Sequence, residues 1–160
     1  MLKSIKKPAA RASGASFAIV ASKYNGRYVD AMLKAAQREL KKAGAKVRVV
    51  RVPGAFEIPA VAAALAADSR NTHHVSRPAA IICLGVIFQG QTSHAQHVGW
   101  GVTHALAQIQ IQHRIPVVHG VFVFEKEEHA KVRCLGRTHN RGTEAAHTAL
   151  EMAKVMRGLA

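Results

Sequence analysis

The stretch from Ala79 to Phe88 (AAIICLGVIF) is apolar almost without interruption. An exposed edge strand would alternate apolar and polar residues, so this pattern is typical of a central strand in a parallel sheet, covered by helices on both faces. Three other segments favour shorter strands: 16–22 (SFAIVAS), 46–52 (KVRVVRV) and 116–124 (PVVHGVFVF). Because basic residues alternate with valines in 46–52, we expect that strand to be less buried than its neighbours.

Helical patterns separate these strands. The spacing of apolar residues predicts helices at about 28–43, 58–67, 93–113 and 142–156, with a short helix at about 127–134. Residues 68–78 form a polar connection. Strands that alternate with helices predict an α/β domain with a parallel sheet and right-handed crossovers.

Length and composition favour a single domain. The chain has 160 residues, of which 49% are hydrophobic, enough for a core without disulfides or structural metals. We expect a basic N-terminal arm over 1–15 and one domain over 16–160. Two cysteines far apart in sequence, with Cys83 inside the apolar run, suggest reduced thiols. No segment reaches the roughly 20 apolar residues of a membrane span, and no signal-peptide pattern precedes the domain, so a cytoplasmic protein is expected.

Positive charge is concentrated at the start of the chain. The formal net charge is +14, and residues 1–51 hold 13 Lys and Arg against two acidic residues. Such a cluster could bind nucleic acid, at least incidentally, by neutralising phosphates. The low aromatic content, 5%, and the lack of a nucleic-acid-binding module favour a solvated basic surface instead.

In a fold of this class, functional residues gather in the loops that follow the strands. The most informative loop is 90–94 (GQTSH), because main-chain N–H groups and the helix dipole at a helix start attract an anion such as phosphate. Alternatively, Thr92 or Ser93 is only an N-cap. The full P-loop pattern is missing, which argues against nucleotide triphosphate hydrolysis.

Several side chains beside these loops could carry chemistry. His94 could transfer protons near neutral pH, or be a plain surface histidine. His94 and His97 have metal-compatible spacing but no definite third ligand, so no metal is predicted. The segment 53–59 (PGAFEIP) suits a pocket for a planar polyhydroxylated ligand, or Glu57 merely stabilises a helix start. Arg133 could bind phosphate in fork geometry, or be solvated.

Six segments together resemble the lumazine synthase family in order and spacing. They are 18–25 (AIVASKYN), 52–59 (VPGAFEIP), 84–85 (LG), 90–94 (GQTSH), 140–142 (NRG) and 150–153 (LEMA). The resemblance covers about residues 16–156. It implies a flavodoxin-like three-layer α/β/α sandwich with a central four-stranded parallel sheet. It also implies that 5-amino-6-(D-ribitylamino)uracil condenses with 3,4-dihydroxy-2-butanone 4-phosphate to 6,7-dimethyl-8-ribityllumazine, releasing phosphate and water.

The resemblance also implies residue roles. His94 would be the catalytic proton-transfer residue, supported by Glu144. The pyrimidine and ribityl chain would be bound by Tyr24, Ala55, Phe56, Glu57, Val86, Ile87, Phe88, His119 and Arg141. The phosphate would be bound by Gly90, Gln91, Thr92 and by Arg133, which in the family comes from the neighbouring subunit. No cofactor is implied.

Three positions depart from the family pattern: Gln89 stands where Arg is usual, His119 where Phe is usual, and Arg141 where Lys is usual. These departures put ligand affinity in question, and a flavin- or lumazine-binding protein with weak or no turnover is one alternative. A basic nucleic-acid-packaging assembly is the other. The family implies a homopentamer, in some members paired into a decamer or closed into an icosahedral shell.

Overall fold

A computed structural model describes residues 12–67 and 77–160. Its single sheet has four parallel strands in the order β2-β1-β3-β4. The strands are β1 (Ser16–Ser22), β2 (Lys46–Val52), β3 (Ala80–Phe88) and β4 (Val117–Phe124). The predicted apolar strand is β3, which lies between β1 and β4 and is buried over most of its length.

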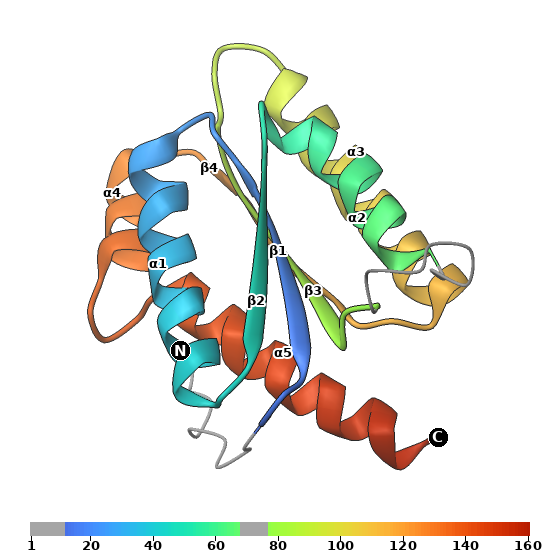
Figure 1. Cartoon of the computed structure of the whole chain (residues 1–160). Helices are drawn as coiled ribbons and strands as arrows, with labels where there is room; N and C mark the ends of the chain where they lie inside the picture. The colour runs from blue at the N-terminus through green and yellow to red at the C-terminus, as the bar shows by residue number, and fades with distance from the viewer. Residues whose placement is uncertain (1–11, 68–76) are drawn as a thin grey trace.

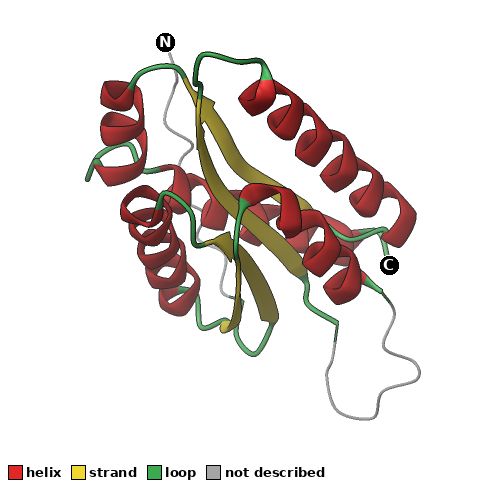
Figure 2. Ribbon diagram, turned by 90° about the horizontal axis from the view of Figure 1, so that it is seen from above, coloured by secondary structure: helices red, strands yellow, loops and turns green. Residues whose placement is uncertain are grey.

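Helices cover both faces of the sheet (Figures 1 and 2). On one face, α1 (Gly26–Lys42) and α5 (Arg141–Gly158) pack over a core that includes Phe17, Ile82 and Leu84. On the other face, α2 (Ile58–Ala66) and α3 (His94–His113) pack over Val20, Ile81 and Cys83. The predicted three-layer α/β/α arrangement is confirmed.

Strand β2 lies at an edge of the sheet and is less buried than its neighbours, as its sequence predicted for its burial. Lys46 and Arg48 are exposed, while Val47 and Val49 pack against the core under α1. Only Val52, at the carboxyl end, is fully buried. The alternation of charged and branched residues therefore marks a strand with one neighbour and one partly solvated face.

One predicted helix is two different elements. The segment expected to form a helix at 127–134 consists of α4 (Glu127–Ala130) followed by a π-helical turn, η2 (Lys131–Leu135). A short 3-10 turn, η1 (Ala55–Glu57), also precedes α2. The other predicted boundaries differ by up to two residues, because helix ends depend on caps and contacts that periodicity does not encode.

The described packing begins at Ala12. Its side chain is buried in the core under α1, and its N–H donates to the Ala43 carbonyl at 2.8 Å. Gly44, in the left-handed region at φ 79°, turns the chain there from α1 into β2. The rest of the predicted arm, 1–11, and most of the polar connection, 68–76, lie outside the described residues.

Candidate active site

Hydrogen bonds tie the carboxyl ends of three strands together. After β1, the N–H of Lys23 donates to the Val52 carbonyl at 2.8 Å and that of Tyr24 to the Pro53 carbonyl at 3.0 Å. The side chain of Asn25 then donates to the Val86 carbonyl at 2.7 Å, at the end of β3. The ends of β1, β2 and β3 therefore form one fixed platform.

Two aromatic side chains stand exposed beside this platform. Tyr24 is 73% exposed and Phe56 64% exposed, although most large apolar side chains of the chain are buried. A Cβ added at Gly101 of α3 would lie 3.6 Å from the Phe56 ring, so this ring lies close to α3. Both rings present accessible faces on which a planar ligand can stack.

The turn that carries Phe56 is held by its own residues. Ala55 is buried near Gly85 of β3, and the Glu57 carboxylate accepts a hydrogen bond from the Gly54 N–H at 2.8 Å. Glu57 thus closes the turn, as the structural alternative predicted. Its side chain is exposed, so one carboxylate oxygen is still available to a ligand.

Side chains at the end of β3 point to opposite faces of the sheet. Val86 and Phe88 belong to the α1 side, where the Phe88 ring lies 5.5 Å from that of Tyr28. Ile87 belongs to the α3 side. Because successive side chains alternate across a strand, Val86 and Phe88 can reach a ligand on the α3 side only through their main chain.

The loop before α3 presents free main-chain donors. The Gln89 side chain donates to the carbonyls of Gly90, at 3.1 Å, and Thr92, at 2.6 Å, so it bonds within its own loop. Within the described residues, the N–H groups of Gly90, Gln91 and Thr92 have no acceptor. These donors are exposed at a helix start, an arrangement that suits an anion.

His94 is the first residue of α3 and is exposed beside this loop. Its N–H lies 3.4 Å from the Thr92 hydroxyl, so Thr92 caps the helix only weakly. The imidazole therefore stands next to the free N–H groups, where it can exchange protons with a bound ligand.

Three predicted residues, His119, Arg141 and Glu144, line a cavity of about 480 Å³ beside β4. His119 and Phe122 of β4 line it together with Arg141 and Glu144 of α5. The Arg141 guanidinium lies 5.6 Å from the centre of the Phe122 ring and is paired with the Glu144 carboxylate. The volume of this cavity is that of a small-molecule pocket.

His119 is held by a residue of α3. Its Nε2 lies 2.9 Å from the Thr103 hydroxyl oxygen, and that hydroxyl donates its proton to the Gly99 carbonyl at 2.8 Å. A hydroxyl has one proton, so in the neutral ring Nε2 carries the hydrogen and donates to Thr103. Burial lowers the pKa of His119 below its usual 6.5, which keeps the ring neutral near pH 7.

Within one chain, the two groups do not meet. Glu144 is bonded to Arg141 on the α5 face, whereas His94 begins α3 on the opposite face, so Glu144 does not support His94 of its own chain. Arg133 lies exposed on η2 and forms no ion pair within the described part of the chain. The cavity lining includes neither His94 nor Arg133.

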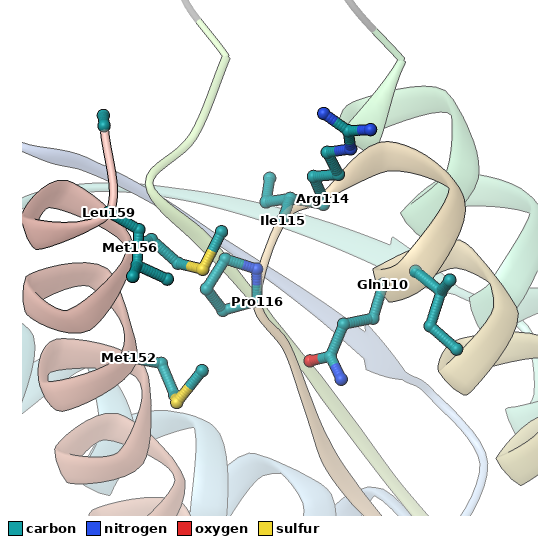
Figure 3. A pocket seen from close by; sticks show the side chains of 9 residues that line it. Gln110, Arg114, Ile115, Pro116, Met152, Met156 and Leu159 are labelled. Carbon is teal, nitrogen blue, oxygen red and sulfur yellow. The ribbon is translucent and has the colours of Figure 1, made fainter.

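A larger cavity, of about 540 Å³, is not the candidate site (Figure 3). It lies between the ends of α3 and α5 at the amino end of β4, and its lining is mostly apolar: Ile111, Ile115, Pro116, Met152, Met156 and Leu159, with Gln110 and Arg114. Ligands of open α/β sheets bind at the carboxyl ends of the strands, and this cavity lacks a set of converging polar groups.

Sequence reasoning did not identify three residues that shape these regions: Asn25, Thr103 and Phe122. Asn25 has the left-handed φ of 54° common for asparagine in turns, and Phe122 shares its face of β4 with Phe124. Nothing local to Thr103 indicates its contact with His119. In residues 12–67 and 77–160, no group of three His, Cys, Asp or Glu side chains is placed to hold a metal ion, and no helix is long and apolar enough to cross a membrane.

Comparisons with known proteins identify the family of the chain. The family model for 6,7-dimethyl-8-ribityllumazine synthase matches residues 14–157. A protein of that name from Stenotrophomonas maltophilia (strain R551-3) is 38% identical over 148 residues, 91% of each chain. Another, from Xylella fastidiosa (strain 9a5c), is 40% identical over 152 residues, covering 93% of this chain and 94% of the relative. The chain therefore belongs to the 6,7-dimethyl-8-ribityllumazine synthase family.

Proposed function

We propose that the chain condenses 5-amino-6-(D-ribitylamino)uracil with 3,4-dihydroxy-2-butanone 4-phosphate to form 6,7-dimethyl-8-ribityllumazine in riboflavin biosynthesis. One observation carries this proposal most directly: the N–H groups of Gly90, Gln91 and Thr92 have no acceptor among residues 12–67 and 77–160, and they lie next to His94 at the start of α3. A phosphate bound there brings the sugar carbons beside an imidazole. The exposed rings of Tyr24 and Phe56 offer a stacking surface for the pyrimidine.

The reaction depends mainly on holding two substrates together. The 5-amino group attacks the ketone and forms an imine with loss of water. Elimination of phosphate then leaves, after tautomerisation, a new carbonyl group. The ribityl-bearing nitrogen attacks this carbonyl and closes the ring with loss of a second water. Orientation of two reactants contributes roughly 7 to 11 kcal/mol to lowering a barrier, whereas one acid/base residue contributes about 10² to 10⁴-fold in rate. In this proposal the α3 loop orients the phosphate, and His94 moves protons to and from the reacting atoms.

A second copy of the chain completes the site in this proposal. The predicted contacts of Arg133, His119, Arg141 and Glu144 lie away from the α3 start of their own chain. If the β4 side of one subunit lies against the α3 start of the next, Arg133 supplies a cation for the phosphate. The other three side chains then line the opposite side of the substrate site. We propose a homopentamer, the assembly that the family resemblance implies. Native mass measurement distinguishes it from a decamer or a shell.

We also propose that the protein acts in the cytoplasm on these small molecules. Two free cysteines support a reducing compartment, since Cys83 and Cys134 are both buried as thiols. Burial raises the pKa of Cys83, and it raises that of Cys134 to about 11, so neither is a ready nucleophile.

The deciding experiment incubates the purified full chain with both substrates and follows the fluorescence of the lumazine together with phosphate release. We expect both signals to rise in equal amounts and to require both substrates. Tight binding of the lumazine without any product would overturn the enzymatic proposal in favour of a binding protein. Nucleic acid that co-purifies and is released by salt, in a protein that forms no lumazine, would favour the packaging assembly.

A further inference from the structure

The turn that carries Arg133 has an unusual backbone. Residues Lys131–Leu135 form a π-helical turn directly after α4, and such turns often occur at functional sites. Arg133 is exposed, while the next residue, Cys134, is fully buried. Since Arg133 forms no ion pair within the described residues, the backbone of this turn is what sets the point from which its side chain extends.

The side chain of Asn140 forms hydrogen bonds that link this turn to α5. Its side-chain NH₂ donates to the Cys134 carbonyl at 2.6 Å, and its side-chain oxygen accepts from the Gly142 N–H at 2.9 Å. Asn140 is only 9% exposed, so both bonds are largely shielded from water. A single amide therefore connects the end of the π-helical turn to the first turn of α5.

The α5 end of this connection is itself fixed. A Cβ added at Gly142 would lie 1.9 Å from the Met32 carbonyl oxygen, so the start of α5 is in tight contact with α1. Arg141 and Glu144, which line the cavity beside β4, stand in the same helical turn. The Asn140 amide thus links the π-helical turn to the helix that lines the cavity, in addition to the packing of Cys134 in the core.

We infer that Asn140 is a positioning residue for phosphate binding: by joining the Cys134 carbonyl to the start of α5, it sets the backbone from which Arg133 reaches the phosphate. This inference rests on the proposed function. The cap on α5 needs only the side-chain oxygen, whereas the hold on the π-helical turn needs only the NH₂ group. The two roles can therefore be separated by substitution.

Asn140→Asp separates them. Aspartate caps a helix about as well as asparagine, so the bond from the Gly142 N–H is kept. It cannot donate to the Cys134 carbonyl, and its negative charge repels that oxygen. We expect KM for the sugar phosphate to rise on the order of tenfold, the loss associated with one buried hydrogen bond, while KM for the pyrimidine stays within about twofold. The inhibition constant of inorganic phosphate should rise by the same factor.

Two comparisons exclude a merely structural effect. Asn140→Ala loses the cap as well as the donor, so it should lower the melting temperature more than Asn140→Asp but raise KM for the sugar phosphate by a similar factor. In an Arg133→Ala background, Asn140→Asp should add almost nothing to the already raised KM, since it acts through the missing arginine. Asn140→Ser replaces the aspartate variant if that protein is unstable, because its hydroxyl can cap the helix but is too short to reach the Cys134 carbonyl as the asparagine NH₂ does.

The outcomes separate this inference from the proposed function. If Arg133→Ala leaves KM for the sugar phosphate unchanged, the proposed phosphate role of Arg133 fails, and the inference fails with it. If Arg133→Ala raises KM but Asn140→Asp does not, only the inference is overturned. The inference is also overturned if the rise in KM across the Asn140 variants is proportional to their loss in melting temperature. It is overturned as well if the effect of Asn140→Asp on KM is as large in the Arg133→Ala background as in the wild type.

Discussion

The α3 start and the edge of β4 offer a ligand two different kinds of contact. At the α3 start, the donors are main-chain N–H groups in a loop whose carbonyls accept hydrogen bonds from the Gln89 side chain. At β4, the contacts come from side chains, chiefly His119 and Arg141. Main-chain donors do not depend on side-chain identity at their own positions, whereas side-chain contacts do.

The sequence departures from the family follow this division. Gln89, in place of the usual Arg, bonds to its own loop, so its substitution leaves the N–H groups of the α3 start accessible. His119 and Arg141 both line the cavity beside β4, where a changed side chain changes the surface that a ligand meets. We therefore expect anion binding to be preserved and pyrimidine binding to be altered.

The largest expected effect tests the α3 start. His94→Ala should lower kcat by about 10²-fold, because one acid/base group is lost while the positioning of both substrates remains. Single-turnover kinetics with both substrates saturating would measure it, and both KM values should change little. Complete loss of turnover with unchanged substrate binding would contradict the view that positioning dominates.

The next effect tests whether the two regions meet across a subunit contact. His94→Ala and Arg133→Ala subunits, unfolded together in equal amounts and refolded, should regain roughly a quarter of wild-type activity at low sugar phosphate, since random neighbours in a head-to-tail ring combine two intact halves at that frequency. Each variant refolded alone is the control. Activity equal to the mean of the two controls would show that each site is built within one chain.

A smaller effect sharpens the β4 side of the comparison. Burial lowers the pKa of His119 in the folded protein. As the pH falls, the imidazole is therefore protonated first in the unfolded chain, and in the folded protein it becomes charged only at a pH below 6.5. That new charge stands near Arg141 in the same cavity, so pyrimidine affinity should weaken as the pH falls. His119→Phe should change KM for the pyrimidine a few-fold at neutral pH.

The pH profile is the sharper readout of this variant. The acid weakening of pyrimidine affinity should disappear in His119→Phe, while KM for the sugar phosphate keeps the same pH dependence in both proteins. Identical pyrimidine profiles in the two proteins would place His119 away from the bound pyrimidine.

The smallest effect is a control outside both regions. Glu39 of α1 accepts hydrogen bonds from Lys42 and, across to α5, from His147 when that ring carries the hydrogen. Burial by itself raises the pKa of Glu39, but the bonds from Lys42, His147 and Arg38 together lower it below its usual 4.5. The folded carboxylate therefore contributes stability above that value, and this contribution is lost as the pH falls through the lowered pKa.

Glu39→Gln should cost about 1 kcal/mol of unfolding free energy at neutral pH and make stability less sensitive to acid. Urea denaturation at neutral pH and below pH 4.5 measures both changes. Neither KM should change. A raised KM for either substrate would show that stability and site geometry are coupled through the packing of α1 on α5.

The sequence predicted the fold where one local pattern sufficed. An apolar run identified β3 as central, and the alternation in 46–52 identified β2 as a less buried strand. The π-helical turn after α4 was missed, because its i to i+5 backbone pattern has no periodicity of its own in a five-residue segment. The Asn140 amide that holds this turn was read only as part of a family motif.

The sequence identified candidate site residues, but it did not predict how they are arranged in space. Loop 90–94 was placed correctly at a helix start, because a strand end followed by a helical pattern fixes that position. The opposite directions of Val86 and Ile87 follow from strand pleating, yet which face each meets depends on where the helices pack. The separation of Glu144 from His94 depends on α3 and α5 covering different faces.

By itself, the sequence determined the order of strands and helices, the central place of β3, the loop before α3 and the family, because each depends on residues close together in the chain or on the order of short motifs. Only the tertiary structure decided that Gln89 bonds to the carbonyls of that loop, that His119 lies within hydrogen-bond distance of Thr103, and that the predicted contacts fall into separate regions. The reason is physical. Contacts between distant residues depend on how helices pack across a sheet, and local periodicity carries no record of that packing.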